Sequence, residues 1–325
     1  MNLIFITGHR KSGTTLLHNL FDGHPSLNNY PVDLSLLYAF FPCCVNADPS
    51  INKKRVSDVI RLSTHGLNGQ YLYNTGTQFD SDDFLEIFWK NAGCLVFNNP
   101  IVLIKTLIES WIEYGHLDPE LPCVVKETSQ SINIYRYEEF GLYCKFIHLV
   151  RDPRDNYSAI FDGIDSYYMK LGEDGKKSLA SFINRARMDL KVASFLKEAE
   201  THRFFALKFE ELLLHTESTM KGVMSFLNLA FDETLFHPTK LGKNDRGNNH
   251  LGIEFKGISS QNVGRWKERL SNDDAGVIEF WLREEMISWG YLPSFDQKAG
   301  LQAFAEFYKW YNCEYFYFDS FKHDK

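Results

Sequence analysis

The sequence predicts an α/β fold in which helices flank a central parallel sheet. Short apolar runs, which suit strands covered on both faces, alternate with segments of helical periodicity. This β-α-β order is typical of parallel sheets, because parallel strands need a crossover connection. The candidate strands are Leu3–Thr7, Cys123–Lys126, Lys145–Val150 and Phe204–Lys208.

The first strand runs directly into a glycine-containing loop that begins a helix. Gly8 and Gly13 allow a tight turn, so that successive N–H groups and the start of the helix can face one anion. A triphosphatase loop of the form GxxxxGK[ST] would have Lys directly after the second glycine, where this chain has Thr14. Arg10 and Lys11 instead supply positive charge inside the loop. We therefore predict an anion-binding loop that differs from that of the triphosphatases.

A segment of mostly helical pattern, about residues 33–118, follows the first β-α unit and precedes the second candidate strand. Within it, Phe79–Asp83 predicts a capped helix start, and the helix continues through Trp89. Insertions between the strands of an α/β sheet usually border substrate pockets. We expect the same of this one.

The third candidate strand ends in Arg151, and Pro153 then begins a helix that carries Ser158 in its early turns. If this strand lies beside the first, Arg151 and Ser158 face the crevice at the carboxyl ends of the strands. A planar guanidinium and a neutral hydroxyl suit a phosphate group. The alternative is a helix start at which Arg and Asp side chains merely form ion pairs.

The C-terminal half continues the helical pattern without a linker or an internal repeat, so we expect a single domain over residues 1–325. In the helix predicted over residues 175–200, Arg185, Arg187 and Lys191 are interpreted as a solvated face and receive no site role. The aromatic tail, about residues 299–325, is expected to pack back on its own domain.

Composition narrows the classes of partner. A formal net charge of −7 argues against broad binding to nucleic acid or to anionic membranes. No apolar stretch approaches the roughly 20 residues that span a bilayer, and a core strand begins right after Met1, so we expect a soluble, cytoplasmic protein. The six cysteines lack metal-ligand spacing, which predicts free thiols and no metal site. The oligomeric state stays open.

The loop Gly8–Leu17 resembles the 5′-phosphosulfate loop of the sulfotransferases that use 3′-phosphoadenosine 5′-phosphosulfate (PAPS). Further motifs of that family follow in the same order along the chain. They are Cys123–Thr128 (CVVKET), Lys145–Ser158 (KFIHLVRDPRDNYS), Lys208–Leu212 (KFEEL), Ser225–Leu229 (SFLNL), Phe255–Gly257 (FKG) and Gly264–Lys267 (GRWK). The resemblance implies a three-layer, P-loop-like fold that uses PAPS, releases the 3′,5′-bisphosphate PAP and needs no metal.

The resemblance also implies which residues contact the nucleotide. Ser12 to Thr15 would hold the 5′-phosphate, and Arg151 and Ser158 the 3′-phosphate, although this chain has one residue fewer before the serine. Phe209 takes the usual Tyr position, where it could still stack on adenine. The full predicted set is Arg10, Lys11, Ser12, Gly13, Thr14, Thr15, Arg151, Ser158, Phe209, Phe255, Lys256 and Gly257; Phe255 replaces the family's Arg, which leaves the contact to Lys256 and the Gly257 N–H.

The catalytic residues that the resemblance implies are Lys11 and Lys126, which would neutralise charge on the transferred group. Thr128 occupies the position of the catalytic His in the aryl and steroid enzymes, and a Thr cannot act as a base at neutral pH. The chain is in this respect closer to the carbohydrate and bacterial members, which use a carboxylate from just after the first helix. Asp33 lies in that region, and Glu127 is the competing candidate; either could instead simply pair with Lys126.

Together these motifs predict transfer of a sulfuryl group from PAPS to the hydroxyl of a glycan or small metabolite. Two alternatives stay open at this point. One is a P-loop kinase that acts on a small metabolite, and the other is a nucleotide-binding protein that has lost catalysis.

Overall fold

The computed structural model describes residues 2–34, 36, 53–72, 76–93, 100–128, 144–163, 175–245, 247 and 257–312. Their centre is a five-stranded sheet, with all strands parallel and the order β2-β3-β1-β4-β5. Its strands are β1 (Leu3–Gly8), β2 (Asn28–Asp33), β3 (Cys123–Lys126), β4 (Cys144–Val150) and β5 (Phe204–Lys208). The α/β fold and the four predicted strands are confirmed.

Strand β2 is an addition to the elements predicted from the sequence. Its residues Asn28-Asn29-Tyr30-Pro31-Val32-Asp33 are half polar and contain a proline, so they lack the signal of a buried strand. Because β2 lies at the edge of the sheet and pairs only with β3, a missing N–H at Pro31 is tolerated there. The pairing shifts register between Asn29 and Asp33, on either side of the proline. Asp33 is thus placed at the end of a strand, before the helices of the insertion begin.

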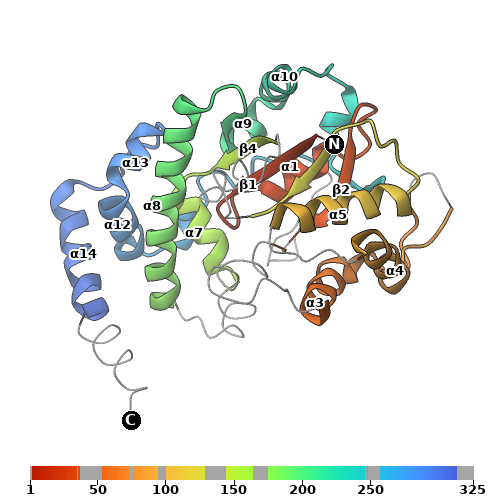
Figure 1. The fold of residues 1–325 in the computed structure, drawn as a ribbon. Coiled ribbons are helices and arrows are strands. Elements are labelled where there is room, and N and C mark those ends of the chain that lie inside the picture. The colour runs from red at the N-terminus through yellow and green to blue at the C-terminus, as the bar shows by residue number, and fades with distance from the viewer. Residues whose placement is uncertain are drawn as a thin grey trace, which may run out of the picture.

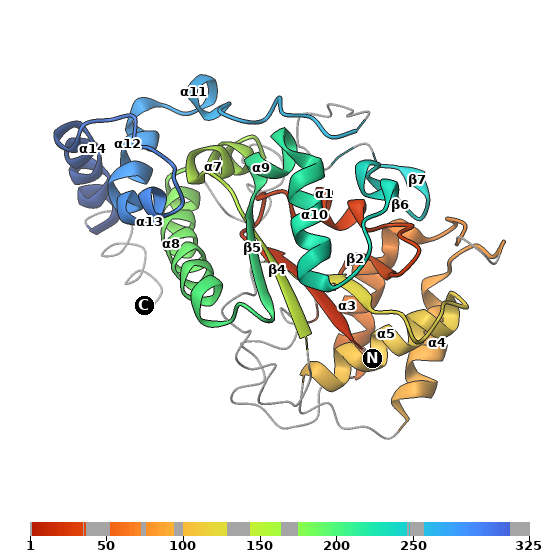
Figure 2. The ribbon, with the colours of Figure 1, turned by 90° about the horizontal axis from the view of Figure 1, so that it is seen from above.

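Helices lie on both faces of the sheet and, toward the C-terminal end of the chain, outside these layers (Figure 1). They are α1 (Thr14–Leu20), α3 (Lys53–Thr64), α4 (Ser81–Ala92), α5 (Pro100–Tyr114), α7 (Pro153–Phe161), α8 (Gly175–Ala199), α9 (Phe209–Leu214), α10 (Thr216–Leu227), α11 (Trp266–Arg269), α12 (Asn272–Trp281), α13 (Arg283–Ser288) and α14 (Gln297–Trp310). Both ribbon views place α12, α13 and α14 together beside α8 at one end of the molecule, and α3, α4 and α5 at the other (Figures 1 and 2).

The alternation of side chains along β1 produces two separate hydrophobic clusters. Leu3 and Phe5 belong to the cluster that includes side chains of α3, α4, α5 and α8. Ile4 and Ile6, which point to the opposite face, belong to the cluster built with α1, α9 and α10. The sheet is therefore the middle of three layers, as predicted.

The predicted helix start at Asp80 is confirmed. The Asp80 carboxylate accepts hydrogen bonds from the backbone N–H groups of Asp82 and Asp83 at 2.8 and 3.1 Å, and α4 begins at Ser81. Such a cap satisfies N–H groups that have no partner within the helix.

The charged face predicted for residues 175–200 lies on α8. Arg185 is exposed, whereas Arg187 and Lys191 reach the carboxylate of Glu285 on α13 at 3.0 and 3.4 Å. The Arg187 guanidinium also lies 5.2 Å from the Trp281 ring centre. These residues attach α8 to the C-terminal helices, far along the chain from the loop.

The aromatic helix α14 packs back on the molecule, as expected. The Phe304 ring stacks against Phe280 and Trp281 of α12, with centroids 4.9 and 5.2 Å apart. The part of the predicted tail after residue 312 lies outside the described residues.

Candidate active site

The loop between β1 and α1 requires its glycines. Gly8 and Gly13 have φ of +143° and +100°, in the region that favours glycine. A Cβ added at Gly13 would lie 2.3 Å from the Phe209 ring, and one at Gly8 would lie 2.4 Å from the Leu149 carbonyl oxygen. The loop is thus pressed against β4 and α9, and no larger residue fits at either position.

Two side chains hold the loop in place by donating hydrogen bonds to its backbone carbonyl groups. Asn156 on α7 donates to the Arg10 carbonyl at 2.8 Å, and Arg151 donates to the Lys11 carbonyl at 2.8 Å. The Ser12 hydroxyl is buried and finds no hydrogen-bond partner within the described part of the chain. With these carbonyls occupied, the loop retains donors for an anion.

Lys126 joins the loop to strand β2. Its ammonium donates to the Thr15 hydroxyl at 3.2 Å and lies 3.0 Å from Oδ2 of Asp33. Asp33 and Lys126 are register partners at the ends of neighbouring strands, which explains why the two side chains meet. The Thr128 hydroxyl donates to the same Asp33 oxygen at 2.8 Å. Three of the residues named from the sequence, Thr15, Lys126 and Asp33, are therefore brought together.

Lys11 lies in a strongly electropositive environment. Burial, followed by the charges of Lys126 and Arg151, lowers the pKa of Lys11 to about 8. Its backbone has φ +65°, a conformation that is uncommon for residues other than glycine. Three cations, Lys11, Lys126 and Arg151, thus act on one another, and Asp33 pairs with one of them; such a cluster suits a multiply charged anionic ligand.

Arg151 connects the loop to the segment before α11. Its second terminal nitrogen donates to the Asn262 carbonyl at 3.0 Å, and its guanidinium lies 4.7 Å from the Phe209 ring centre. Burial lowers the pKa of Arg151 from its ordinary value. Its Nε is buried, and the described residues offer it no hydrogen-bond partner. The guanidinium therefore keeps donor capacity on the crevice side of β4.

Of the other predicted nucleotide contacts, Ser158 and Phe209 are buried and two lie outside the described residues. Ser158 is buried on α7, and Phe209 is only 6% exposed, packed between Gly13 and the Arg151 guanidinium. Arg151 is thus the stacking partner that the structure gives to Phe209, and stacking on adenine stays a prediction. Gly257 is described, whereas Phe255 and Lys256 lie outside the described residues.

The two candidate bases differ in accessibility. The Asp33 side chain is 28% exposed, whereas Glu127 is only 1% exposed. Asp33 does pair with Lys126, as the alternative interpretation of this residue anticipated. Its Oδ1 nevertheless has no hydrogen-bond partner in the described ranges. Asp33 is therefore the more exposed of the two carboxylates, although its Oδ1 is itself buried.

The acidic residues of the Arg-Asp-Pro-Arg-Asp run form contacts that the sequence did not predict. Arg154 pairs with Asp152 at 2.6 Å and with the buried Glu279 of α12 at 2.5 Å. Asp155 instead accepts from the backbone N–H groups of Gly264 and Trp266 at 2.6 and 2.8 Å. The ion-pair interpretation of this run therefore applies to Arg154 and Asp152. The two motifs that Asp155 links are more than a hundred residues apart, and no local pattern reveals the link.

The described residues show neither a candidate metal site nor a candidate membrane span. They contain no group of three or more His, Cys, Asp or Glu side chains that could hold a metal ion, and no helix long and apolar enough to cross a membrane. Cys123 and Cys144 are free and buried, and burial raises the pKa of each thiol to about 12.

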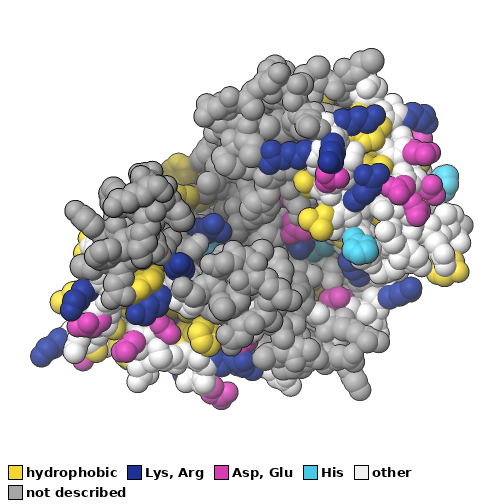
Figure 3. All heavy atoms as spheres, turned by 90° about the horizontal axis from the view of Figure 1, so that it is seen from below, with side chains coloured by type: hydrophobic (Ala, Val, Ile, Leu, Met, Phe, Trp, Pro, Cys, Tyr) yellow, Lys and Arg dark blue, Asp and Glu magenta, His cyan; other side chains and the backbone are white. Residues whose placement is uncertain are grey.

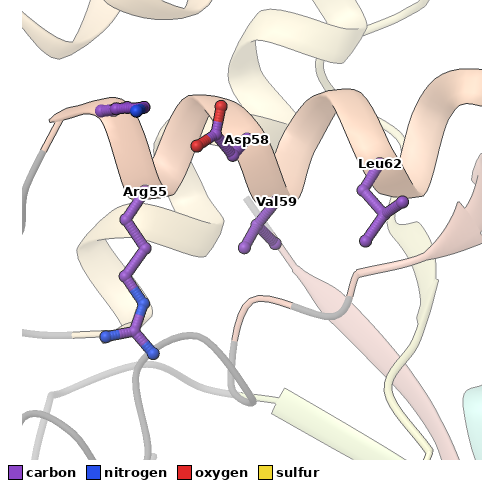
Figure 4. Close-up of a pocket in the computed structure, with 5 residues that line it drawn as sticks. Arg55, Asp58, Val59 and Leu62 are labelled. Atoms are coloured by element: carbon purple, nitrogen blue, oxygen red, sulfur yellow. The ribbon is translucent and has the colours of Figure 1, made fainter. Parts of the chain in front are cut away.

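A hollow lies along α3, away from the loop residues described above. Lys54, Arg55, Asp58, Val59 and Leu62 line it, all from one helix (Figure 4). Leu62 is 79% exposed, and among the described residues no second element supplies converging polar groups, so we assign this hollow no role. On the face shown in Figure 3, basic side chains of the described residues stand among acidic ones.

The three-layer parallel sheet and the glycine-containing loop after β1 define an α/β domain of the P-loop-like class. The chain belongs to the sulfotransferase domain family, whose model matches residues 2–290. The family expected from the motifs is therefore confirmed.

Individual relatives are distant. The omega-hydroxy-beta-dihydromenaquinone-9 sulfotransferases Stf3 of Mycobacterium bovis (strain ATCC BAA-935 / AF2122/97) and Mycobacterium tuberculosis (strain CDC 1551 / Oshkosh) are each 23% identical to this chain over 266 residues. The match covers 70% of this chain and 62% of each relative, so the chain spans less than two thirds of their length. The sulfotransferase domain from the curacin biosynthetic pathway has a similar fold, with a TM-score of 0.54, 21% identity and coverage of 90% of this chain and 98% of that domain.

Proposed function

We propose that the protein transfers the sulfuryl group of PAPS to the hydroxyl of a glycan or small metabolite. One observation carries the proposal: a single ammonium, that of Lys126, contacts both the loop hydroxyl of Thr15 and the carboxylate of Asp33. In this proposal Thr15 contacts the sulfuryl donor and Asp33 contacts the acceptor. The ammonium of Lys126 touches both residues, and its charge also acts on Lys11.

The residues present fit a nucleotide with phosphate groups at two positions. The Ser12 hydroxyl and Arg151 Nε are buried polar groups for which the described chain provides no hydrogen-bond partner, which is costly unless a ligand supplies one. The Ser12 N–H already donates to the His9 carbonyl at 3.1 Å, so the backbone donors left for an anion are those at the start of α1, which have no partner within the helix. We assign the 5′-phosphate to Ser12–Thr15 and the 3′-phosphate to Arg151, with Ser158 beside it.

Each catalytic residue has a distinct task in this proposal. PAPS, when bound, supplies the sulfuryl group, whose bond to the phosphate oxygen breaks as the bond to the acceptor oxygen forms. Lys11 and Lys126 place fixed positive charge where negative charge develops, which lowers the barrier without a metal ion. Asp33 takes the proton of the acceptor hydroxyl, while Lys126 and Thr128 hold its carboxylate in place through Oδ2.

The acceptor is proposed only as a class. The names of the mycobacterial relatives describe an omega-hydroxylated menaquinone, and the chemistry that we carry over to this chain is the hydroxyl alone. A cytoplasmic location and the absence of a metal requirement belong to the same proposal.

Calorimetry with PAP and 5′-AMP tests the nucleotide assignment, and labelled transfer from PAPS to glycans, phenols, lipids and hydroxy acids tests the activity. We expect PAP to bind at least about tenfold more tightly than 5′-AMP, since the 3′-phosphate adds charge-assisted hydrogen bonds. Equal affinities would refute the 3′-phosphate site. Thermal stabilisation by ATP with magnesium but not by PAP would favour a kinase, and tight PAP binding with no transfer to any acceptor would favour a protein that has lost catalysis.

A further inference from the structure

Asp155, in the first turn of α7, uses both of its carboxylate oxygens on one distant segment. Oδ2 accepts from the Gly264 N–H at 2.6 Å, and Oδ1 accepts from the Trp266 N–H at 2.8 Å. The residue is only 2% exposed, so water does not replace these bonds. A buried carboxylate that receives two N–H donors is a strong and geometrically specific anchor.

The anchored segment leads back to the proposed 3′-phosphate site. Two residues before Gly264, the carbonyl of Asn262 accepts from the terminal nitrogen of Arg151 at 3.0 Å. Gly264 has φ +75°, which gives this turn a shape that is set by glycine. The contacts form a chain from Asp155, through the backbone at Gly264 and Asn262, to the guanidinium of Arg151.

The neighbouring residue of α7 has a matching task on the other side. Asn156 holds the Arg10 carbonyl of the loop, while Arg151 holds the Lys11 carbonyl. Asp155 holds the segment that contains Asn262, and Asn156 holds the loop that contains Lys11. The guanidinium of Arg151 donates to a carbonyl of each. The charge of Asp155 also favours the charged form of Arg151, whose pKa burial lowers.

An amide cannot do what this carboxylate does. The side chain of Asn has one acceptor oxygen, and its NH2 group would face the second backbone N–H, leaving two donors opposed in a buried position. Asp155→Asn is therefore a nearly isosteric change that releases the segment at one end.

We propose that Asp155 is a positioning residue that fixes the guanidinium of Arg151 for the nucleotide 3′-phosphate by anchoring the segment Asn262–Trp266. This inference rests on the proposed use of PAPS and adds to it a residue that does not itself touch the nucleotide. It predicts a defect confined to the 3′-phosphate, whereas a purely structural role predicts equal loss of every nucleotide.

The experiment is calorimetric titration of the full chain with PAP and with 5′-AMP, for the wild type, Asp155→Asn and the exposed control Asp273→Asn. We expect Asp155→Asn to weaken PAP binding at least about fivefold, the effect of losing roughly 1 kcal/mol, while 5′-AMP binding changes by less than about twofold. Asp273→Asn, at the start of α12, should leave both affinities unchanged.

If Asp155→Asn does not fold, Asp155→Ser, which retains one acceptor oxygen, takes its place. An unchanged ratio of PAP to 5′-AMP affinity in the folded variant overturns the inference, whether both affinities fall or neither does. A wild type that fails to prefer PAP overturns the proposed nucleotide and this inference together, so the two failures are distinguished by the wild-type titration.

Discussion

The hydroxyl of Thr128 donates a 2.8 Å hydrogen bond to Oδ2 of Asp33. Thr128 stands where the resemblance to the aryl and steroid enzymes places a catalytic His, and Asp33 is the carboxylate proposed to take over that task. Thr128, at the position of the usual base, thus orients Asp33, the base proposed in its place. Together with the Lys126 ammonium at 3.0 Å, it occupies one oxygen of Asp33 and fixes the direction of the other.

Removing the Thr128 hydroxyl should therefore slow transfer without weakening nucleotide binding. We predict that Thr128→Val lowers kcat roughly tenfold, since a hydrogen bond to a charged group contributes about 1.5–3 kcal/mol and part of that loss is recovered by water. Thr128→Ser, which keeps the hydroxyl, should stay near the wild-type rate. Steady-state kinetics and PAP titrations measure the two effects, and a normal kcat for the Val variant would contradict the positioning role.

Asp33→Asn should remove most of the transfer activity. A general base contributes typically ~10²–10⁴-fold, so we expect a loss of kcat in that range while PAP affinity and melting temperature persist. Glu127→Gln is the matched comparison, because Glu127 is the other candidate and is 1% exposed. Normal turnover of the Asp33 variant with loss in the Glu127 variant would move the base to Glu127, and normal turnover of both would refute a carboxylate base.

Lys11 should give the pH profile a descending limb. Its pKa of about 8 means that the ammonium is present below pH 8 and is lost as the pH rises through that value. We predict that kcat/KM, which reports on the free enzyme, falls above about pH 8 toward a tenfold loss per pH unit. Lys11→Arg, whose guanidinium stays charged, should shift this limb to higher pH.

Lys11→Ala tests the same residue in a second way. We expect kcat to fall by at least ~10²-fold while PAP binding weakens less, since the ammonium is placed against charge that develops during transfer. Equal losses in kcat and in PAP affinity would make Lys11 a binding residue only.

A side chain at Gly13 should disable the loop. Gly13 has φ +100°, and an added Cβ would lie 2.3 Å from the Phe209 ring, so Gly13→Ala must move either the loop or the ring. We expect a loss of about 1–3 kcal/mol in unfolding free energy, together with loss of measurable PAP binding. Gly66→Ala is the control, because a Cβ there meets nothing within 4 Å; denaturant unfolding and calorimetry decide between the two variants.

The parts that the sequence predicted well are those in which local chemistry determines local structure. The apolar runs became β1, β3, β4 and β5, and Asp80 capped α4, because burial on both faces and N-capping leave patterns that can be read within a few residues. Strand β2 left no such pattern. At a sheet edge, polar residues and Pro31 are allowed, and only pairing with β3 identifies the strand.

The site shows the same division. Lys126 and Asp33 could be named from the motifs, but their ion pair depends on the register of β2 against β3. Asp155 could not be named as an anchor, because its partners Gly264 and Trp266 are set beside it only by the folded chain. Tertiary hydrogen bonds to backbone groups leave no signature in the identity of the residues that donate them.

The opposite orientation of neighbouring side chains in β1 has an evolutionary consequence. Leu3 and Phe5 pack with the helices over residues 53–114, whereas Ile4 and Ile6 pack with α1 and α10, which support the loop. We expect substitutions among the cluster residues of α3, α4 and α5 to leave the packing of α1 and α10 unchanged, since the sheet lies between the two clusters. If the proposed reaction holds, such a chain can evolve toward a new acceptor through one layer while the other layer keeps the packing beneath the loop unchanged.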